Sequence, residues 1–273
     1  MADLAKQLRA KDFRNAVKAI GEMSRLDPAA RAALVPTTKA KDEQRAFQFQ
    51  VARIVADGGA SALAARWKEL ASPEWRENLV SAIAGAFHTW VSEGSVDALI
   101  TALGDPVDNV ARQSVTLLTA CLREPTARER KDAAKTLSGT VALETFDRAA
   151  QWMTTARRER ITQLVTDRLA RRAANPKALT WPDWYIELLG HSATRADQRS
   201  IAVLEGFRPM AGEPRRTEFE KLDPWNLPWP TSVLAEKRGI PPGTPFVRIW
   251  SLGTGLLDLK NLQEALARIR ARA

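Results

Sequence analysis

The chain of 273 residues has a single cysteine, Cys121, and only two histidines, His88 and His191. One cysteine excludes an intramolecular disulfide framework and favours a reducing compartment, so the cytoplasm is the expected location. The histidines lie far apart in the sequence and no second cysteine accompanies them, which excludes the ligand spacing of a zinc site. We therefore expect neither a bound metal nor another cofactor.

Long hydrophobic runs are missing as well. No stretch approaches the ~18 consecutive apolar residues of a membrane span. The N-terminal segment MADLAKQLRAKDF carries charges where a secretory signal has its apolar core. Hydrophobic residues make up 45% of the chain and charged residues 27%, which is close to the average of globular proteins. This composition predicts a folded, soluble protein that makes no membrane contact.

Positive charge is in excess, and the excess is unevenly distributed. The formal net charge is +9. Residues 1–124 hold 16 Lys and Arg against 15 Asp and Glu, residues 125–216 hold 17 against 11, and residues 217–273 hold 8 against 6. Because a local excess of one sign concentrates partners of the other sign, the middle of the chain is the expected place for a negatively charged partner.

Residues 96–122, VDALITALGDPVDNVARQSVTLLTACL, predict two helices joined by a sharp turn. Apolar residues recur at helical spacing on both sides of the turn. Gly104 suits a helix C-terminus with positive φ, Asp105 can cap the next helix, and Pro106 fits its first turn. The apolar arc of the second helix is too wide for one partner helix, which favours a stack of helical hairpins.

Related patterns occur earlier in the chain. With Asp42, Glu74 and Asp105 aligned as helix starts, the separations are 32 and 31 residues, and equivalent positions further along are almost all apolar. Shorter helices are expected in the gaps, at residues 27–35, 60–71 and 96–103. Self-similarity of this length is typical of an α-solenoid. The large residues predicted to be buried are Phe47, Val51, Leu79, Ile83, Val110 and Leu118.

The segment ALITALGDPVDNVARQSVTLLTACL resembles a HEAT repeat, with the Asp-Pro turn and Val110 at the expected place in the second helix. It departs from the family pattern at the next position, where Ala111 replaces the usual arginine and Arg112 follows. The resemblance covers residues 42–122 and extends through flanking helices over roughly the first 205 residues. It implies an all-α, right-handed, curved solenoid whose second helices line the inner surface.

Helical spacing continues after residue 122 without a clean period, at residues 127–137, 143–153, 156–174, 182–190 and 195–205. Residues 207–250 then contain eight of the fifteen prolines and three of the nine tryptophans, which predicts an irregular arm. A closing helix is expected at residues 258–270. We therefore predict a HEAT-like α-solenoid at residues 1–206, followed by a Pro/Trp-rich arm and C-terminal helix at residues 207–273 that pack on the solenoid.

Four arginines form a row in the most charged segment, ARRERITQLVTDRLARRAAN. Arg157, Arg160, Arg168 and Arg171 fall within roughly 80° of one another on a helical wheel. Such a row can follow the phosphates of a nucleic acid, because arginine stays charged and binds an anion through two hydrogen bonds at once. The alternative is a solvated helix face that nearby acidic residues partly neutralise.

Tryptophans provide two further candidates. Trp225 and Trp229 lie in the proline-rich arm without a helical face, so they either cap the open end of the solenoid or insert into a partner. Trp181 and Trp184 flank Asp183 in TWPDWYIELLG, an arrangement loosely similar to the aromatic and acidic sites of HEAT-like DNA glycosylases. The simpler interpretation is a helix start at which both tryptophans pack against the next hairpin.

These patterns favour a non-catalytic interaction scaffold that binds a protein partner through the solenoid surface, with the C-terminal arm as a second contact. Nucleic-acid binding through the basic half, residues 125–216, is the alternative, and a glycosylase-like enzyme is the third. No nucleophile elbow or phosphate-binding loop occurs in the sequence. We therefore expect no catalytic residue.

Overall fold

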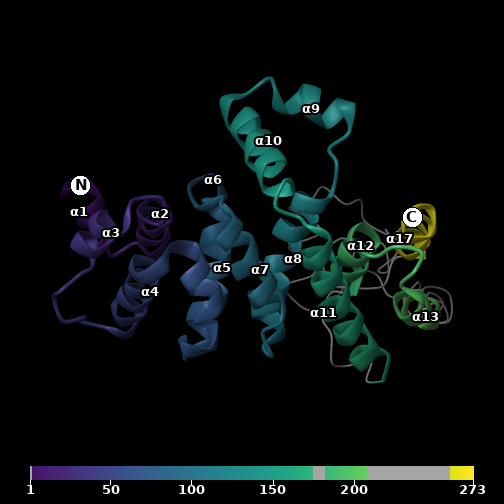
Figure 1. The fold of residues 1–273 in the computed structure, drawn as a ribbon, viewed down its shortest axis with the longest axis horizontal. Helices are drawn as coiled ribbons and strands as arrows, with labels where there is room; N and C mark the ends of the chain where they lie inside the picture. Colours follow the sequence, from purple (N-terminus) through teal and green to yellow (C-terminus); the bar gives the residue numbers. More distant parts are fainter. Residues whose placement is uncertain (1, 175–181, 208–258) are drawn as a thin grey trace, which may run out of the picture. The chain divides into compact units, whose positions relative to one another are not determined.

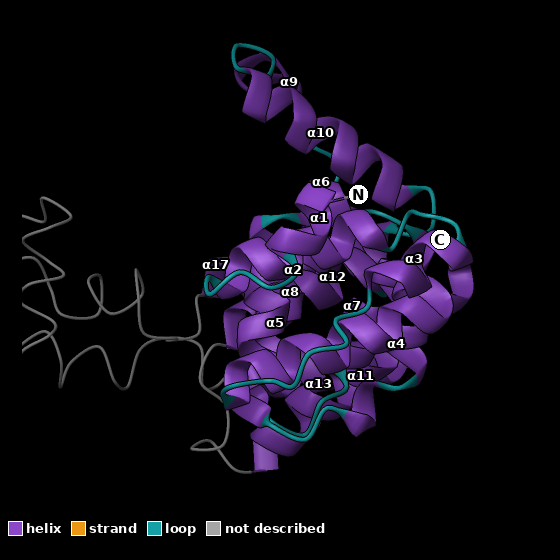
Figure 2. Ribbon diagram, turned by 90° about the vertical axis from the view of Figure 1, so that its left-hand side faces the viewer, coloured by secondary structure: helices purple, strands orange, loops and turns teal. Residues whose placement is uncertain are grey.

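The computed structural model describes residues 2–174, 182–207 and 259–273. All regular structure in these three ranges is helical, without a strand, which confirms the all-α prediction (Figures 1 and 2). None of the described helices is both long enough and apolar enough to cross a membrane.

The first described range contains most of the helices, and the two later ranges contain the rest. The first holds α1 (Ala2–Gln7), α2 (Phe13–Met23), α3 (Pro28–Leu34), α4 (Glu43–Ala65), the 3-10 helix η1 (Trp67–Glu69), α5 (Pro73–Gly85), α6 (Phe87–Trp90), α7 (Glu93–Leu103), α8 (Asp108–Leu122), α9 (Ala127–Ala133), α10 (Leu137–Ala150) and α11 (Thr155–Ala174). The later ranges hold α12 (Pro182–Ser192), α13 (Gln198–Phe207) and α17 (Leu259–Ala271).

The chain divides into two compact units, unit 1 at residues 1–161 and unit 2 at residues 162–273. The division falls inside α11. The domain boundary predicted after residue 206 stays a prediction, because the chain that follows Phe207 lies outside the described residues.

Side-chain caps decide where many helices of unit 1 begin. Asp12, Asp27 and Asp42 each precede a helix and accept a hydrogen bond from the backbone N–H three residues later, at 2.8–2.9 Å. Each carboxylate thereby satisfies one of the free N–H groups of a first helical turn. The predicted helix start at Asp42 is confirmed.

The core of unit 1 is built by helices that are distant in sequence. The helix α4 packs on α2, α3 and α7, while α8 packs on α5 and α7 (Figure 1). All six residues predicted to be buried have side chains at most 4% exposed, which confirms that part of the prediction, and they are Phe47, Val51, Leu79, Ile83, Val110 and Leu118.

The predicted helix at residues 60–71 starts where the sequence predicts and ends earlier. Gly58 and Gly59 have non-helical backbone angles and separate two helical stretches within α4; the second stretch ends at Ala65, and η1 follows. Gly59 has φ 66°, a conformation that glycine adopts without steric cost. The predicted helix at residues 127–137 is interrupted, because Thr136 caps a new helix, α10.

The turn at residues 104–107 also differs from the prediction. The helix α8 begins at Asp108, and its cap residue, Val107, makes no side-chain capping bond. Gly104 has φ −81°, so no positive φ is needed there. The Asp105 carboxylate accepts a bond from the Val107 N–H at 2.9 Å, which closes the turn ahead of the helix.

The same carboxylate is the centre of a buried polar cluster. Trp67 Nε1 donates to Asp105 Oδ2 at 2.9 Å, and Arg76 Nε donates to the same oxygen at 2.8 Å. Arg76 Nη1 also donates to the carbonyl of Leu70 at 2.6 Å. The Asp105 side chain is 2% exposed. We call Trp67, Arg76 and Asp105 the Asp105 cluster, and it joins the chain after α4 to the turn before α8.

The helix α6 is fastened to α2 by Trp90. This side chain is fully buried, and its Nε1–H donates to the Val17 carbonyl at 3.0 Å. The indole lies directly on Gly21, where a Cβ would come within 2.6 Å of Trp90 Cδ1. A glycine at this point of α2 is what lets the ring reach the backbone.

Replacing Gly94 with alanine is expected to lower the free energy of unfolding by about 1–3 kcal/mol, the usual cost of overpacking. A Cβ on Gly94 would overlap the backbone of Ser61, with Ser61 Cα at 2.8 Å, so α7 would have to move off α4. Urea denaturation followed by circular dichroism measures the effect. Gly85→Ala is the matched control, since a Cβ there meets nothing within 4 Å, and an equal loss in both variants would contradict the prediction.

In unit 2, α17 packs against α12 and α13. Gly190 of α12 brings the two backbones together, because a Cβ there would lie 2.9 Å from Ala265 Cα. Leu262, Leu266 and Ile269 are buried, as predicted for one face of a closing helix. The existence of this helix is thus confirmed.

Candidate interaction surface

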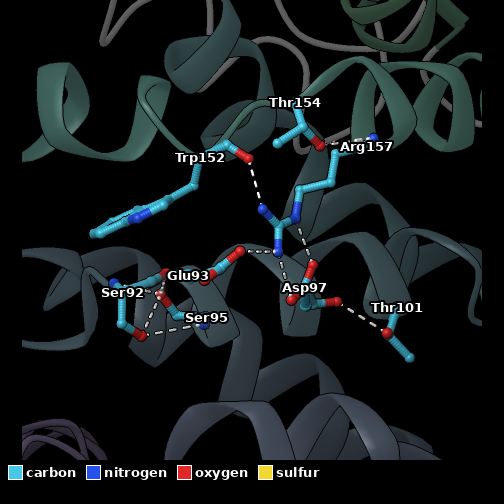
Figure 3. Close-up of polar contacts among 8 residues, drawn as sticks. All are labelled: Ser92, Glu93, Ser95, Asp97, Thr101, Trp152, Thr154 and Arg157. Atoms are coloured by element: carbon cyan, nitrogen blue, oxygen red, sulfur yellow. Dashed lines mark hydrogen bonds and ion pairs between the residues drawn. The ribbon is translucent and has the colours of Figure 1, made fainter.

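Arg157, the first member of the predicted arginine row, is bound inside unit 1 (Figure 3). Its Nε donates to Asp97 Oδ1 at 2.7 Å and its Nη2 to Asp97 Oδ2 at 2.9 Å, while Nη2 also donates to Glu93 Oε1 at 2.8 Å. Its Nη1 donates to the Trp152 carbonyl at 2.8 Å. The guanidinium is therefore engaged on all three of its nitrogens.

The acidic partners of Arg157 are positioned by the start of α7. Ser92 and Ser95 form a reciprocal capping box, which starts the helix at Glu93 and places Asp97 one turn later on the same face. The hydrogen bonds to Asp97 are the main cause that raises the pKa of Arg157 above its ordinary value, and burial opposes them. Arg157 therefore holds the start of α11 against α7 and is not presented to a phosphate.

The other three arginines of the row differ in exposure. Arg168 is 7% exposed, and its guanidinium carbon lies 5.7 Å from the centre of the Tyr185 ring, a cation–π distance. Arg160 and Arg171 are exposed. Two of the four guanidinium groups are thus taken up by contacts inside the protein, and two face solvent.

Many other cations of the predicted basic half are paired with carboxylates. Such pairs reduce the local positive potential that residues 125–216 would otherwise create. The pairs in or next to this segment are Arg123–Glu129 at 2.7 Å, Arg128–Asp132 at 3.8 Å, Lys135–Asp132 at 2.7 Å, Arg130–Asp147 at 3.0 Å and Arg199–Asp167 at 2.6 Å.

The tryptophan candidates are only partly described. Trp225, Trp229 and Trp181 lie outside the described residues. The helix α12 begins at Pro182, as the helix-start interpretation of TWPDWYIELLG expects. Trp184 is 39% exposed.

The sole cysteine is a core residue. Cys121 is buried in α8, and burial raises the pKa of its thiol to about 12. A thiol with this pKa is uncharged near neutral pH and a poor nucleophile. Within the described ranges, no three His, Cys, Asp or Glu side chains gather in the manner of a metal site.

The hairpin of α9 and α10 stands away from the other helices of unit 1 (Figures 1 and 2). No residue of α9 is buried, and only Thr145 and Ala149 of α10 are. Phe146 anchors the hairpin through a ring contact with Phe87 at 5.8 Å. At the opposite end Leu137 is 83% exposed, so the hairpin presents an apolar side chain at its tip.

Sequence patterning missed this exposed tip. It assigned Leu137 to the end of one long helix, whereas the residue begins α10. The signal that indicates the break is Thr136, a capping residue followed at the third position by Gly139, whose N–H bonds to Thr136 Oγ1 at 3.0 Å.

Comparisons of the chain with protein families, with curated proteins and with solved structures find no match.

Proposed function

We propose that this protein is a non-catalytic interaction scaffold, built as a right-handed HEAT-like solenoid, that binds a protein partner. The helix packing of unit 1 supports the solenoid, because helices of successive hairpins pack side by side, as in α4 with α7 and α5 with α8. The HEAT-like segment at residues 96–122 supports it as well. The cytoplasm remains the expected location, since a free thiol such as Cys121 suits a reducing compartment.

The observation that carries this proposal is the α9–α10 hairpin. A helix that buries no side chain contributes little to the stability of its own domain, since apolar burial is the main source of that stability. Leu137 at its tip is 83% exposed. The hairpin therefore suits a protein surface that offers an apolar pocket for this side chain. The C-terminal arm with Trp225 and Trp229 stays a second predicted contact.

Nucleic-acid binding through residues 125–216 is the second candidate. The exposed side chains of Arg160 and Arg171 favour it. The ion pairs of Arg157 and the burial of Arg168 weigh against a continuous row of four phosphate contacts.

Leu137→Asp is expected to weaken binding of the protein partner about 30-fold, the loss of about 2 kcal/mol that marks an interface hot spot. The partner is first obtained by photo-crosslinking from a benzoylphenylalanine at position 137, with a second one at Lys68, an exposed residue of η1, as the reference position. The purified partner is then titrated against wild type and variant by calorimetry.

Ser138→Asp is the matched control, because Ser138 is the exposed neighbour of Leu137 and the introduced charge is the same. It is expected to change the affinity little. Crosslinking that is no stronger from position 137 than from position 68, or equal affinities of Leu137→Asp and wild type, would refute the hairpin as the docking element.

A further inference from the structure

The N-terminal helices carry an excess of positive charge, although residues 1–124 as a whole are nearly balanced. Residues 1–53 contain 11 Lys and Arg against 6 Asp and Glu, whereas residues 54–124 contain 5 against 9. Three of the six acids, Asp12, Asp27 and Asp42, cap helices, where the positive helix N-terminus partly balances their charge. The net charge of +5 in residues 1–53 is therefore concentrated on exposed side chains.

Four of these cations lie in α2 or within two residues of its ends. Lys11, Arg14, Lys18 and Arg25 are exposed. Arg14 and Lys18 lie one turn apart on the same face of α2, whereas Lys11 precedes the N-cap residue Asp12 and Arg25 follows the C-cap residue Ser24. Other faces of α2 are buried, including Ala16, Ile20 and Met23. We call these four residues the α2 stripe.

The cations of the α2 stripe are not neutralised by ion pairs. In the part of the chain that the structure describes, none of the four is within ion-pair distance of a carboxylate. Arg25 Nη2 donates to the backbone carbonyl of His88, which holds the guanidinium beside α6. The pKa of Arg25 is lowered, first by burial and then by the neighbouring Arg148 of α10, with Glu22 opposing both.

The surroundings of the stripe lack a large apolar side chain on the surface. Among the described residues the exposed large hydrophobics are Leu137 and Trp184, and neither belongs to α1 or α2. Protein interfaces are centred on buried aromatic or aliphatic anchors, whereas nucleic-acid interfaces are polar and strongly positive. We propose that the α2 stripe binds the phosphate backbone of a nucleic acid.

The geometry suits contact with the backbone and not with base edges. Duplex DNA carries one negative charge per about 1.7 Å of its axis, so Arg14 and Lys18, one helical turn apart, can each meet a phosphate. Lysine and arginine at phosphates position a protein without reading sequence. The stripe is therefore a general attachment to nucleic acid, independent of the protein partner proposed for the hairpin.

The test measures binding of the full chain to a fluorescein-labelled duplex of random sequence by anisotropy, over a series of salt concentrations. Arg14→Gln/Lys18→Gln removes two phosphate contacts, so the slope of log affinity against log salt is expected to become less steep by about 1.8. When salt rises tenfold, from 0.1 M to 1 M, the affinity of the variant is therefore expected to fall by a factor about 60-fold smaller than that of the wild type. Arg53→Gln/Lys68→Gln, an equal charge change at two exposed residues of α4 and η1, is the matched control and is expected to keep the wild-type slope. Circular dichroism and melting temperature verify that both variants are folded.

Three results would overturn the proposal. The first is a wild-type dissociation constant weaker than the ~10⁻⁴–10⁻⁶ M of sequence-independent binding at physiological salt. The second is a loss of affinity in the control variant that equals or exceeds the loss in the α2 variant. The third is binding of a polyglutamate of equal charge as tightly as the duplex, which would assign the stripe to an acidic protein.

Discussion

Asp105→Ala is expected to lower the free energy of unfolding by about 3–5 kcal/mol, because removal of one partner from a buried ion pair leaves the other charge uncompensated. In the variant the Arg76 guanidinium loses its carboxylate, and the N–H groups of Trp67 and Val107 lose their acceptor. Urea denaturation monitored by far-UV circular dichroism gives the free energy directly.

Asp57→Ala is the control for this experiment, because it deletes an aspartate that pairs with an arginine on the surface. Asp57 binds Arg66 at 2.6 Å, yet its side chain is 67% exposed, and Arg66 also binds Glu69. Solvent screens such a pair, so the stability is expected to stay almost unchanged. If Asp105→Ala were as mild as Asp57→Ala, the Asp105 cluster would not be the buried support that we describe.

Trp90→Ala is expected to lower the free energy of unfolding by about 3–5 kcal/mol through the cavity it leaves. The indole is fully buried and lies on Gly21, and its Nε1–H satisfies the Val17 carbonyl. The variant therefore loses apolar contact between α6 and α2 and the hydrogen bond from the indole to the Val17 carbonyl. Thermal and urea unfolding measure the loss.

Two further variants separate the contributions of the indole. Trp90→Phe keeps most of the apolar volume and removes the hydrogen bond, so a smaller loss of about 1–3 kcal/mol is expected. Trp184→Ala truncates a tryptophan that is 39% exposed and is expected to cost far less than Trp90→Ala. Equal losses at positions 90 and 184 would show that Trp90 does not hold α6 on α2.

Helix locations and core residues followed from local patterns. Phe47, Val51, Leu79 and Ile83 were predicted from a period of about 3.6 residues, and the structure buries all four. Such a pattern works because a helix satisfies its own backbone hydrogen bonds, so its apolar face is set by the spacing of residues close in sequence. The solenoid arrangement and its handedness remain predictions, because they depend on contacts between distant segments.

Positions where one residue has two possible roles were harder to predict. The sequence predicts that Asp105 caps a helix. In the structure its carboxylate instead accepts hydrogen bonds from Trp67 and Arg76, which lie 38 and 29 residues away in sequence. The helix α8 therefore starts later, at Asp108. A carboxylate has several acceptor sites, and only the folded chain decides which donors reach it.

The sequence by itself determined that the regular structure of the described residues is helical, where most of these helices lie, and which large apolar residues are buried in unit 1. Only the tertiary structure decided which charges are available to a partner. Arg157 in the predicted basic half is bound by Asp97, 60 residues away, whereas Arg14 and Lys18 in a segment of nearly balanced charge remain exposed. The physical reason is that net charge counts residues along the chain, while electrostatic attraction depends on distances of a few ångströms in space.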